Sequence, residues 1–267
     1  MRPTAKQAVQ RVLHRLGLDV RWHVPRPVHA LSTLLDLYNV DTVFDIGAST
    51  GNSGQYLRNI GFGGRIVSFE PVSGVYRQLA ARAANDPLWQ CENIALGDEA
   101  GERRINVSGA GGVSSSLLAS TGHMEAQEPA LRTVGSEMVR VETLRSVVER
   151  HYPSGSRLFL KIDAQGYEKQ ILEGAGSQLD KVVGMRIELS LVRSYEGAPL
   201  MADMLPYLAG LGYRLCGIEE AWSNRTTQEV YEVDAVLFRT DRAVGGCRAG
   251  VNNQKPGVAY GIDGSSR

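Results

Sequence analysis

Short apolar runs along the middle of the chain alternate with stretches whose apolar side chains recur at helical spacing. An apolar run of about four to eight residues is typical of a strand buried on both faces, and a spacing of about three to four residues is typical of an amphipathic helix. The alternation predicts an α/β fold, in which a mostly parallel sheet carries helices on both faces. The runs behind this prediction are residues 42–46, 65–69, 157–163, 182–191 and 230–238.

The segments between these runs complete the predicted order of elements. We expect a third strand over residues 89–96, a strand over residues 103–108 that pairs back, and a short strand and helix over residues 139–150. A further helix is predicted over residues 200–211. A polar, glycine-rich loop over residues 108–129 interrupts this order, and a loop of this length inside a compact domain usually covers a site or contacts a substrate.

The pattern predicts one folded domain with a segment on either side. Residues 40–240 contain all the predicted strands, which is a usual length for one α/β domain. Residues 1–39 begin with a basic amphipathic helix, in which six Lys and Arg accompany one Asp over the first 30 positions. Two interpretations stay open: a helix packed on the domain, and a surface that contacts anionic lipid. Residues 241–267 are rich in Gly, Asn and Ser, and we expect a flexible tail there.

Composition argues against several classes of protein. The 267 residues include 29 Lys and Arg and 29 Asp and Glu, so no net charge draws the chain to nucleic acid. The three cysteines are far apart and lack zinc-site spacing, so we expect neither a zinc site nor a disulfide framework, and we assign no metal ligands. No apolar run reaches the length of a membrane span, and the N-terminus lacks a signal-peptide core. We expect a cytoplasmic protein, at the inner face of the membrane if the basic helix contacts lipid.

The segment from Asp45 to Glu70 carries the clearest chemical signal. Asp45 lies in the first strand, and Gly47 and Gly51 after it allow a tight turn and a close approach of the backbone to a ligand. Glu70 follows 25 residues after Asp45, at the carboxyl end of the second strand, where an acid can accept hydrogen bonds from the hydroxyls of a ribose. The segment predicts a βαβ unit that binds a nucleoside.

The glycine spacing discriminates between nucleoside cofactors. A dinucleotide fingerprint G-x-G-x-x-G that starts at Gly47 requires glycine at position 49, and this chain has Ser49. A carboxylate such as Asp45 beside the loop suits a cationic ligand better than a pyrophosphate. These features favour S-adenosylmethionine. An NAD(P)-linked oxidoreductase acting on a nucleotide sugar, a non-catalytic partner-binding module, and a βαβ unit whose glycines serve only turns remain as alternatives.

The chain resembles the FkbM family of S-adenosylmethionine-dependent O-methyltransferases over residues 40–240. The segment at residues 161–168, Lys-Ile-Asp-Ala-Gln-Gly-Tyr-Glu, is the most specific to the family, whereas many methyltransferases share the first glycine loop. One departure is Gln165, where members commonly have an acid. The other segments that carry the resemblance are residues 43–51, 69–71, 93–98, 114–117 and 187–188.

The resemblance implies a class I methyltransferase fold, Rossmann-like, with seven strands of which the last is antiparallel. It also implies methylation of a hydroxyl on a small-molecule or lipid-linked sugar acceptor, or on a related natural product. By position, the first glycine loop would face the methionine part of the cofactor, Glu70 the ribose, and the turn at residues 95–98 the adenine. The predicted cofactor contacts are Asp45, Gly47, Ala48, Gly51, Asn52, Glu70, Pro71, Ala95, Leu96 and Asp98.

Methyl transfer to a hydroxyl also requires a group that takes the hydroxyl proton. Asp163, at the carboxyl end of a predicted strand, is the first candidate, although it could instead cap the following helix. Glu188 is the second candidate, as a base or as a ligand to sugar hydroxyls. His123 in the glycine-rich loop is the third, because the pKa of a histidine is near neutrality. The serines at 114–116 could bind a polar acceptor or form a hinge.

Overall fold

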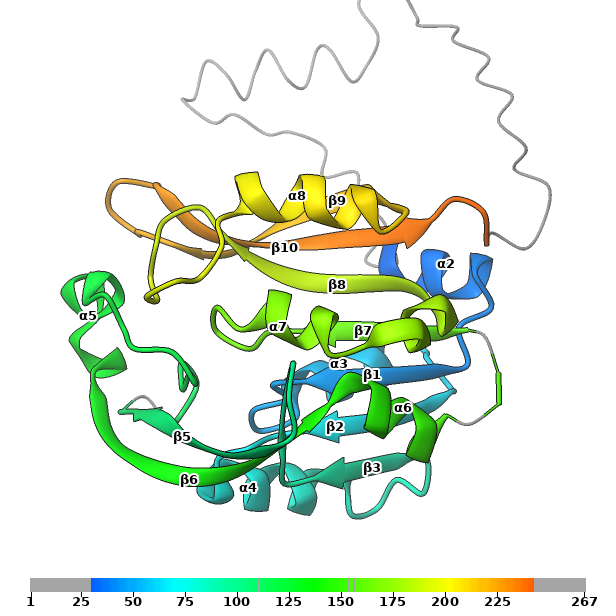
Figure 1. The fold of residues 1–267 in the computed structure, drawn as a ribbon, viewed down its shortest axis with the longest axis horizontal. Helices are drawn as coiled ribbons and strands as arrows, with labels where there is room; N and C mark the ends of the chain where they lie inside the picture. The colour runs from blue at the N-terminus through cyan, green and yellow to red at the C-terminus, as the bar shows by residue number, and fades with distance from the viewer. Residues whose placement is uncertain (1–29, 110, 153, 156, 243–267) are drawn as a thin grey trace, which may run out of the picture.

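The computed structural model describes residues 30–242, apart from residues 110, 153 and 156 (Figure 1). The predicted basic helix lies in residues 1–29, outside the described residues, and so does nearly all of the predicted tail. The described residues form a large sheet with helices on both faces and a small sheet at one end of it. This arrangement confirms the predicted α/β class.

The seven strands of the large sheet are β1 (Thr42–Ile46), β2 (Arg65–Phe69), β3 (Trp89–Glu92), β7 (Leu158–Ile162), β8 (Val182–Ser190), β9 (Tyr213–Ser223) and β10 (Val230–Arg239). Their order across the sheet is β3-β2-β1-β7-β8-β10-β9. The first five in this order run parallel, and β10 lies antiparallel between β8 and β9. This order confirms the class I methyltransferase fold that the resemblance implies.

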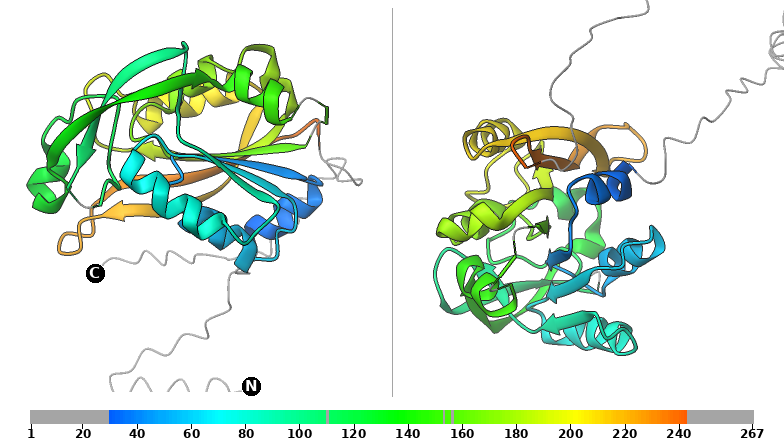
Figure 2. Two further views of the ribbon diagram at one scale, coloured as in Figure 1. Left: turned by 90° about the horizontal axis from the view of Figure 1, so that it is seen from below. Right: turned by 90° about the vertical axis from the view of Figure 1, so that its right-hand side faces the viewer.

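Helices cover both faces of the large sheet, as Figure 2 shows from below and from the side. One layer consists of α2 (Ala30–Leu37), α3 (Asn52–Asn59) and α4 (Ser73–Ala83). The other consists of α6 (Leu144–His151), α7 (Glu168–Glu173) and α8 (Met201–Gly210). The predicted helix over residues 200–211 is therefore confirmed as α8.

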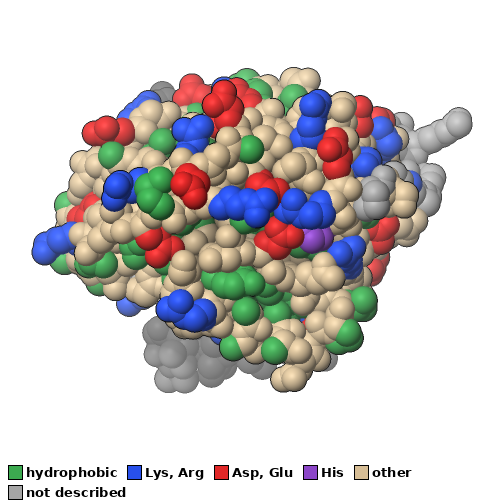
Figure 3. Space-filling model, turned by 60° about the horizontal axis from the view of Figure 1, so that its bottom comes forward, with side chains coloured by type: hydrophobic (Ala, Val, Ile, Leu, Met, Phe, Trp, Pro, Cys, Tyr) green, Lys and Arg blue, Asp and Glu red, His purple; other side chains and the backbone are tan. Residues whose placement is uncertain are grey.

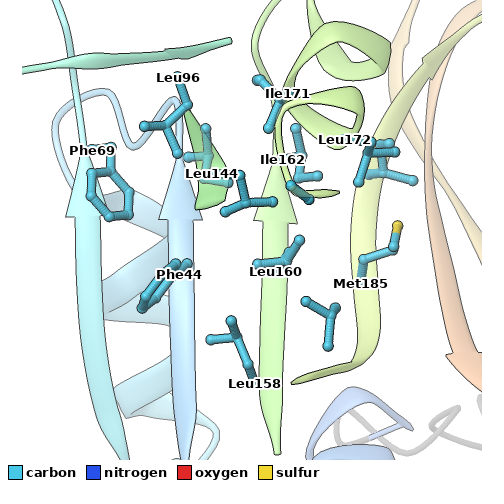
Figure 4. Packing of buried hydrophobic residues seen from close by; sticks show 14 of the residues in the cluster. Phe44, Phe69, Leu96, Leu144, Leu158, Leu160, Ile162, Ile171, Leu172 and Met185 are labelled. Carbon is cyan, nitrogen blue, oxygen red and sulfur yellow. The ribbon is translucent and has the colours of Figure 1, made fainter. Parts of the chain in front are cut away.

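Neighbouring residues of a strand supply the two separate cores. Val43 and Phe159 pack with α2, α3 and α4, whereas Phe44 and Leu160, one position further along, pack with α6, α7 and α8 (Figure 4). All four side chains are at most 1% exposed. The central strands are apolar on both faces because each face is covered by helices, which explains the continuous apolar runs in the sequence.

The small sheet contains β4 (Ala95–Gly97), β5 (Gly101–Ser108) and β6 (Thr133–Thr143), in the order β4-β6-β5. The predicted single strand over residues 89–96 is therefore wrong, because β3 ends at Glu92 and β4 belongs to the other sheet. Asn93 lies at the break, where its side-chain amide donates hydrogen bonds to the carbonyl oxygens of Glu70 and Pro71. The predicted short strand near residue 139 is longer than expected and begins at Thr133.

Two further features escaped the sequence-based prediction. The edge strand β9 has neither an alternating nor a continuous apolar pattern, since most of its side chains are exposed. The glycine-rich loop contains a short helix, α5 (His123–Gln127), and leads to a 3-10 helix at Pro129–Leu131. A second 3-10 helix, at Gly176–Lys181, connects α7 to β8.

The described surface carries both signs of charge side by side. On the face in Figure 3, basic and acidic side chains are interspersed, in keeping with the equal totals of the chain. Arg150 on α6 forms ion pairs with Glu92 at 2.6 Å and with Glu142 at 2.7 Å, which ties this helix to β3 and β6. None of the described helices has the length and apolar character needed to cross a membrane.

Gly54 lies where α3 contacts β3, and this contact leaves no room for a side chain at that position. A Cβ atom at Gly54 would lie 2.1 Å from Cζ2 of Trp89, whose indole N–H donates to Ser68. We expect Gly54→Ala to lower the free energy of unfolding by about 1–3 kcal/mol, measured by urea denaturation, although alanine favours helix. Gly74→Ala on α4 is the control, since its nearest neighbouring atom is 3.8 Å away and its stability should not fall. Equal stability of both variants would contradict the packing argument.

Candidate active site

A cavity of about 240 Å³ opens at the carboxyl ends of β1, β2 and β7. Its wall includes the loop after β1, the end of β2, strand β4, and residues 112, 113, 115 and 117 of the glycine-rich loop. In an open α/β sheet ligands bind at this end of the strands. The small sheet contributes Ile105 to the wall, so the cavity lies between the two sheets.

The loop after β1 is held in a tight turn by the backbone. The N–H groups of Gly47 and Ala48 both donate to the carbonyl oxygen of Phe69 at 3.0 Å. Gly47 has φ +70°, and a Cβ atom there would lie 1.8 Å from the carbonyl oxygen of Asp163. Only glycine fits this position. Ser49 also has a positive φ, +47°, which places its N–H 2.8 Å from a carboxylate oxygen of Glu70.

Glu70 presents a buried carboxylate to the cavity. One of its oxygens accepts the N–H of Ser49 and the other accepts the N–H of Val72 at 2.9 Å, so the group is fixed in place. Burial raises the pKa of Glu70 to about 7, although these two hydrogen bonds act in the opposite direction. Each oxygen keeps lone pairs for further donors. Such a carboxylate can bind a pair of hydroxyls.

Lys161 joins the ends of β1 and β7. Its ammonium group donates to the carbonyl oxygen of Gly47 at 3.1 Å and to the Asp163 carboxylate at 3.2 Å, and it lies 3.7 Å from Asp45. Burial would lower the pKa of Lys161, but the charges of Asp163 and Asp45 raise it further than burial lowers it. Asp45 itself is fully buried and also accepts the hydroxyl of Ser68. It supports Lys161 from beneath and does not line the cavity.

Asp163 lines the cavity and is linked to Glu188 through Gln165. The side-chain amide of Gln165 donates to both carboxylates at 2.8 Å. Burial would raise the pKa of Asp163, but Lys161 and the Gln165 amide keep it below its usual value. Burial and the charge of Asp163 raise the pKa of Glu188 well above its usual value. Of the two groups, Asp163 therefore ionises first as the pH rises, and Glu188 keeps its proton to a higher pH.

The cavity brings together most, but not all, of the predicted site residues. Asp45, Gly51 and Asp98 do not line it, although Tyr167, which does, donates its hydroxyl to Asp98. Glu188 lies behind Gln165. His123 is also absent from the wall, and its ring packs at 4.9 Å against Tyr231. The predicted residues in the wall are Gly47, Ala48, Asn52, Glu70, Pro71, Ala95, Leu96 and Asp163.

The prediction gave no site role to several residues of the wall. Lys161 was named only within the family-specific segment and Gln165 only as a departure from the family pattern, whereas Ser115 is one of the serines expected to bind a polar acceptor or form a hinge. Tyr167 lay in the most family-specific segment, which was the one available signal for it. Among the described residues, no group of three or more His, Cys, Asp and Glu is arranged to hold a metal ion.

The sequence matches the family model of the methyltransferase FkbM domain over residues 45–215, which is more than half of the chain. The chain belongs to the FkbM methyltransferase family. The methyl donor of this FkbM methyltransferase is S-adenosylmethionine. The alternative of an NAD(P)-linked oxidoreductase is thereby wrong.

The residues of the cavity fit this cofactor. The turn at Gly47 leaves no room for a side chain, and the Glu70 carboxylate has free lone pairs for ribose hydroxyls. Ile94, Ala95 and Leu96 add an apolar wall for a flat base. The bound cofactor supplies an electrophilic methyl group on a positively charged sulfur. The Asp163 carboxylate lies in the same wall of the cavity.

Solved structures with a similar fold are distant in sequence. The fibrillarin/Nop5p complex contains a chain with 11% identity and a TM-score of 0.41, covering 74% of this chain and 72% of that one. The methyltransferase domain of bacterial CtHen1-C has 9% identity and a TM-score of 0.43, covering 79% and 96%. A putative tRNA methyltransferase from Streptococcus pneumoniae, in complex with S-adenosyl-L-methionine, has 10% identity and a TM-score of 0.44, covering 80% and 75%.

These values are too low to bear on the substrate. A search among curated proteins found no match to this sequence. The family match is therefore the finding that identifies the chain, and the acceptor has to be argued from the cavity.

The raised pKa of Glu70 makes cofactor binding dependent on pH. Ribose hydroxyls donate to the ionised carboxylate, and with a pKa of about 7 the ionised fraction falls as the pH drops below neutrality. We expect S-adenosylhomocysteine to bind about tenfold more tightly at pH 8 than at pH 6, measured by calorimetry. Glu70→Gln should weaken binding at pH 8 by about 1.5–3 kcal/mol and abolish the pH dependence. Equal affinity of the unaltered protein at both pH values would exclude Glu70 as the ribose ligand.

Proposed function

We propose that this methyltransferase acts on a hydroxyl of a sugar, on a glycolipid or a related natural product. The observation that carries the proposal is the Asp163 carboxylate, which lines the cavity and is kept ionised by Lys161. The hydroxyl oxygen must lose its proton as it accepts the methyl group, and a fixed carboxylate in the wall can take that proton.

The charges of the wall support a neutral acceptor. Among the described residues that line the cavity, Lys161 is the single basic one, and its charge is already paired with Asp163. An acceptor that carries phosphates, such as a nucleic acid, would find no unpaired cation there. The hydroxyl groups of Thr50, Ser53 and Ser115 in the wall can instead form hydrogen bonds with sugar hydroxyls.

The glycine-rich loop supports an acceptor with an apolar part. Val113 in this loop lines the cavity and is 58% exposed, and Leu117 follows it in the wall. An apolar side chain that is open to solvent at the wall of a polar cavity suits the lipid or aglycone part of an acceptor. Contact of the basic N-terminal segment with a membrane belongs to the same proposal, because it would bring the cavity to lipid-linked sugars.

A methyl-transfer assay tests the proposal. The purified protein is incubated with methyl-labelled S-adenosylmethionine and with glycolipids, free sugars or RNA, and the label is traced in the product. We expect label in an ether that resists alkaline hydrolysis, formed on glycolipid or sugar. Label in RNA alone would overturn the proposed acceptor class, and so would label in a product that alkali releases as methanol.

Asp163→Asn separates catalysis from cofactor binding. The amide keeps the size of the side chain but cannot take a proton, so we expect the turnover number to fall by about 10²–10⁴-fold. The affinity for S-adenosylhomocysteine should change little. Asp180→Asn is the matched control, because Asp180 is 75% exposed and lies outside the cavity wall, and its turnover should be unchanged. Full activity of Asp163→Asn would remove Asp163 as the base.

A further inference from the structure

Gln165 is held in an unfavourable backbone conformation inside the site. Its φ is +54°, in the left-handed region that residues other than glycine seldom adopt, and it is 8% exposed. Such conformations persist where surrounding contacts impose them, and they concentrate at functional sites. The contacts that hold Gln165 in this conformation therefore indicate its function.

Four hydrogen bonds fix the orientation of Gln165. The side-chain N–H₂ group donates to Asp163 and Glu188, each at 2.8 Å. The side-chain oxygen accepts the hydroxyl of Tyr195 at 2.6 Å, and the backbone carbonyl accepts the hydroxyl of Ser116 at 2.7 Å. A flipped amide would point its oxygen at two acids, so the donors must face the carboxyl groups.

The two carboxyl groups that Gln165 bridges stand in opposite electrostatic surroundings. Asp163 has the Lys161 ammonium at 3.2 Å. Within residues 30–242, as far as the structure describes them, Glu188 has no ion-pair partner, and the nearby Arg186 is paired with Asp234 at 2.7 Å. The titratable groups around the pair are mostly acidic: Glu168 at the start of α7, Glu232 and Asp234 on β10, and Tyr195 after β8.

We propose that Gln165 is the positioning residue of the active site, whose amide fixes the Asp163 carboxylate toward the cavity and couples it to Glu188. The inference rests on the proposed function, in which Asp163 takes the hydroxyl proton. In the reaction the oxygen–hydrogen bond of the acceptor breaks and the oxygen–methyl bond forms. The sulfur keeps the electrons of the broken sulfur–methyl bond, and the proton goes to the Asp163 carboxylate.

Gln165 has two consequences for this pair. Its N–H₂ group stabilises negative charge on Asp163, so the base is ionised before the acceptor binds. It also places a hydrogen-bond donor between the two carboxyl groups, which lets them lie close together. Replacement by glutamate would keep the shape and put a third acid between them.

A carboxyl titration that needs no acceptor tests the proposal. The side-chain carbons of Asp and Glu are labelled with ¹³C, and the signals of Asp163 and Glu188 are assigned with Asp163→Asn and Glu188→Gln. In the unaltered protein we expect the two groups to titrate as a coupled pair, one of them below the usual range of a carboxyl group and the other above it. In Gln165→Glu the lower of the two midpoints should rise by at least one pH unit.

Two further variants keep the test decisive. Gln165→Met retains the volume without a donor, and it should raise the lower midpoint too, so the test survives if Gln165→Glu fails to fold. Gln90→Glu on β3 is the matched control: it makes the same chemical change at an exposed position, outside the cavity wall, and should leave both midpoints unchanged. Midpoints in both Gln165 variants that equal those of the unaltered protein would overturn the proposal.

The same variants separate positioning from cofactor binding. The affinity for S-adenosylhomocysteine should stay within about threefold in Gln165→Met, because Glu70 and the glycine loop are untouched. With an acceptor found in the labelling assay, the turnover number should fall at least tenfold at pH 7, and the acidic limb of its pH profile should move upward with the lower midpoint. An unmoved limb would overturn the proposal. Failure to find any acceptor would count against the proposed function, while the titration would still decide the role of Gln165.

Discussion

The buried ammonium group of Lys161 is the charge on which the rest of the site depends. It lies between Asp45 and Asp163, and it also donates to the carbonyl oxygen of Gly47 in the turn after β1. Two carboxylates this close would otherwise repel each other in a low dielectric, and leaving one buried charge unpaired costs about 3–5 kcal/mol. One cation thus fixes the shape of the glycine loop and the charge of the proposed base.

This dependence explains why binding and chemistry share one wall of the cavity. Asp45 and Ser68 do not line the cavity but form hydrogen bonds behind its wall: the hydroxyl of Ser68 donates to Asp45, and Trp89 donates to Ser68 from the neighbouring strand. The support reaches from β3 through β2 and β1 to β7, all within the continuous parallel part of the sheet. Rigid strands hold the charged groups, and the loops above them provide the variable part of the wall.

The features that could be predicted from sequence are those that depend on local rules. The buried strands at residues 42–46 and 65–69, the turn at Gly47 and the acid at the end of β2 follow from apolar runs, glycine and strand ends. The break between β3 and β4 could not be predicted, because it depends on Asn93 bonding to a chain segment more than 20 residues away. Strand β9 could not be predicted either, because it pairs only at the edge and buries few side chains.

The burial of Asp45 and the bridging position of Gln165 could not be predicted from the sequence, because both depend on side chains from other parts of the fold. An acid near the end of a strand is equally compatible with facing a ligand and with pairing with a lysine, and for Asp45 the partner is Lys161 on β7. The orientation of the Gln165 amide depends on the two carboxyl groups that accept its N–H₂ group and on Tyr195, 30 positions along the chain, whose hydroxyl donates to its oxygen. Ser49 and Gln165 both lie in the cavity wall and both have a positive φ, which residues other than glycine disfavour. In each of them this conformation accompanies an N–H group that donates to a carboxylate. The local departures from sequence rules therefore mark the chemistry, as is expected where function opposes stability.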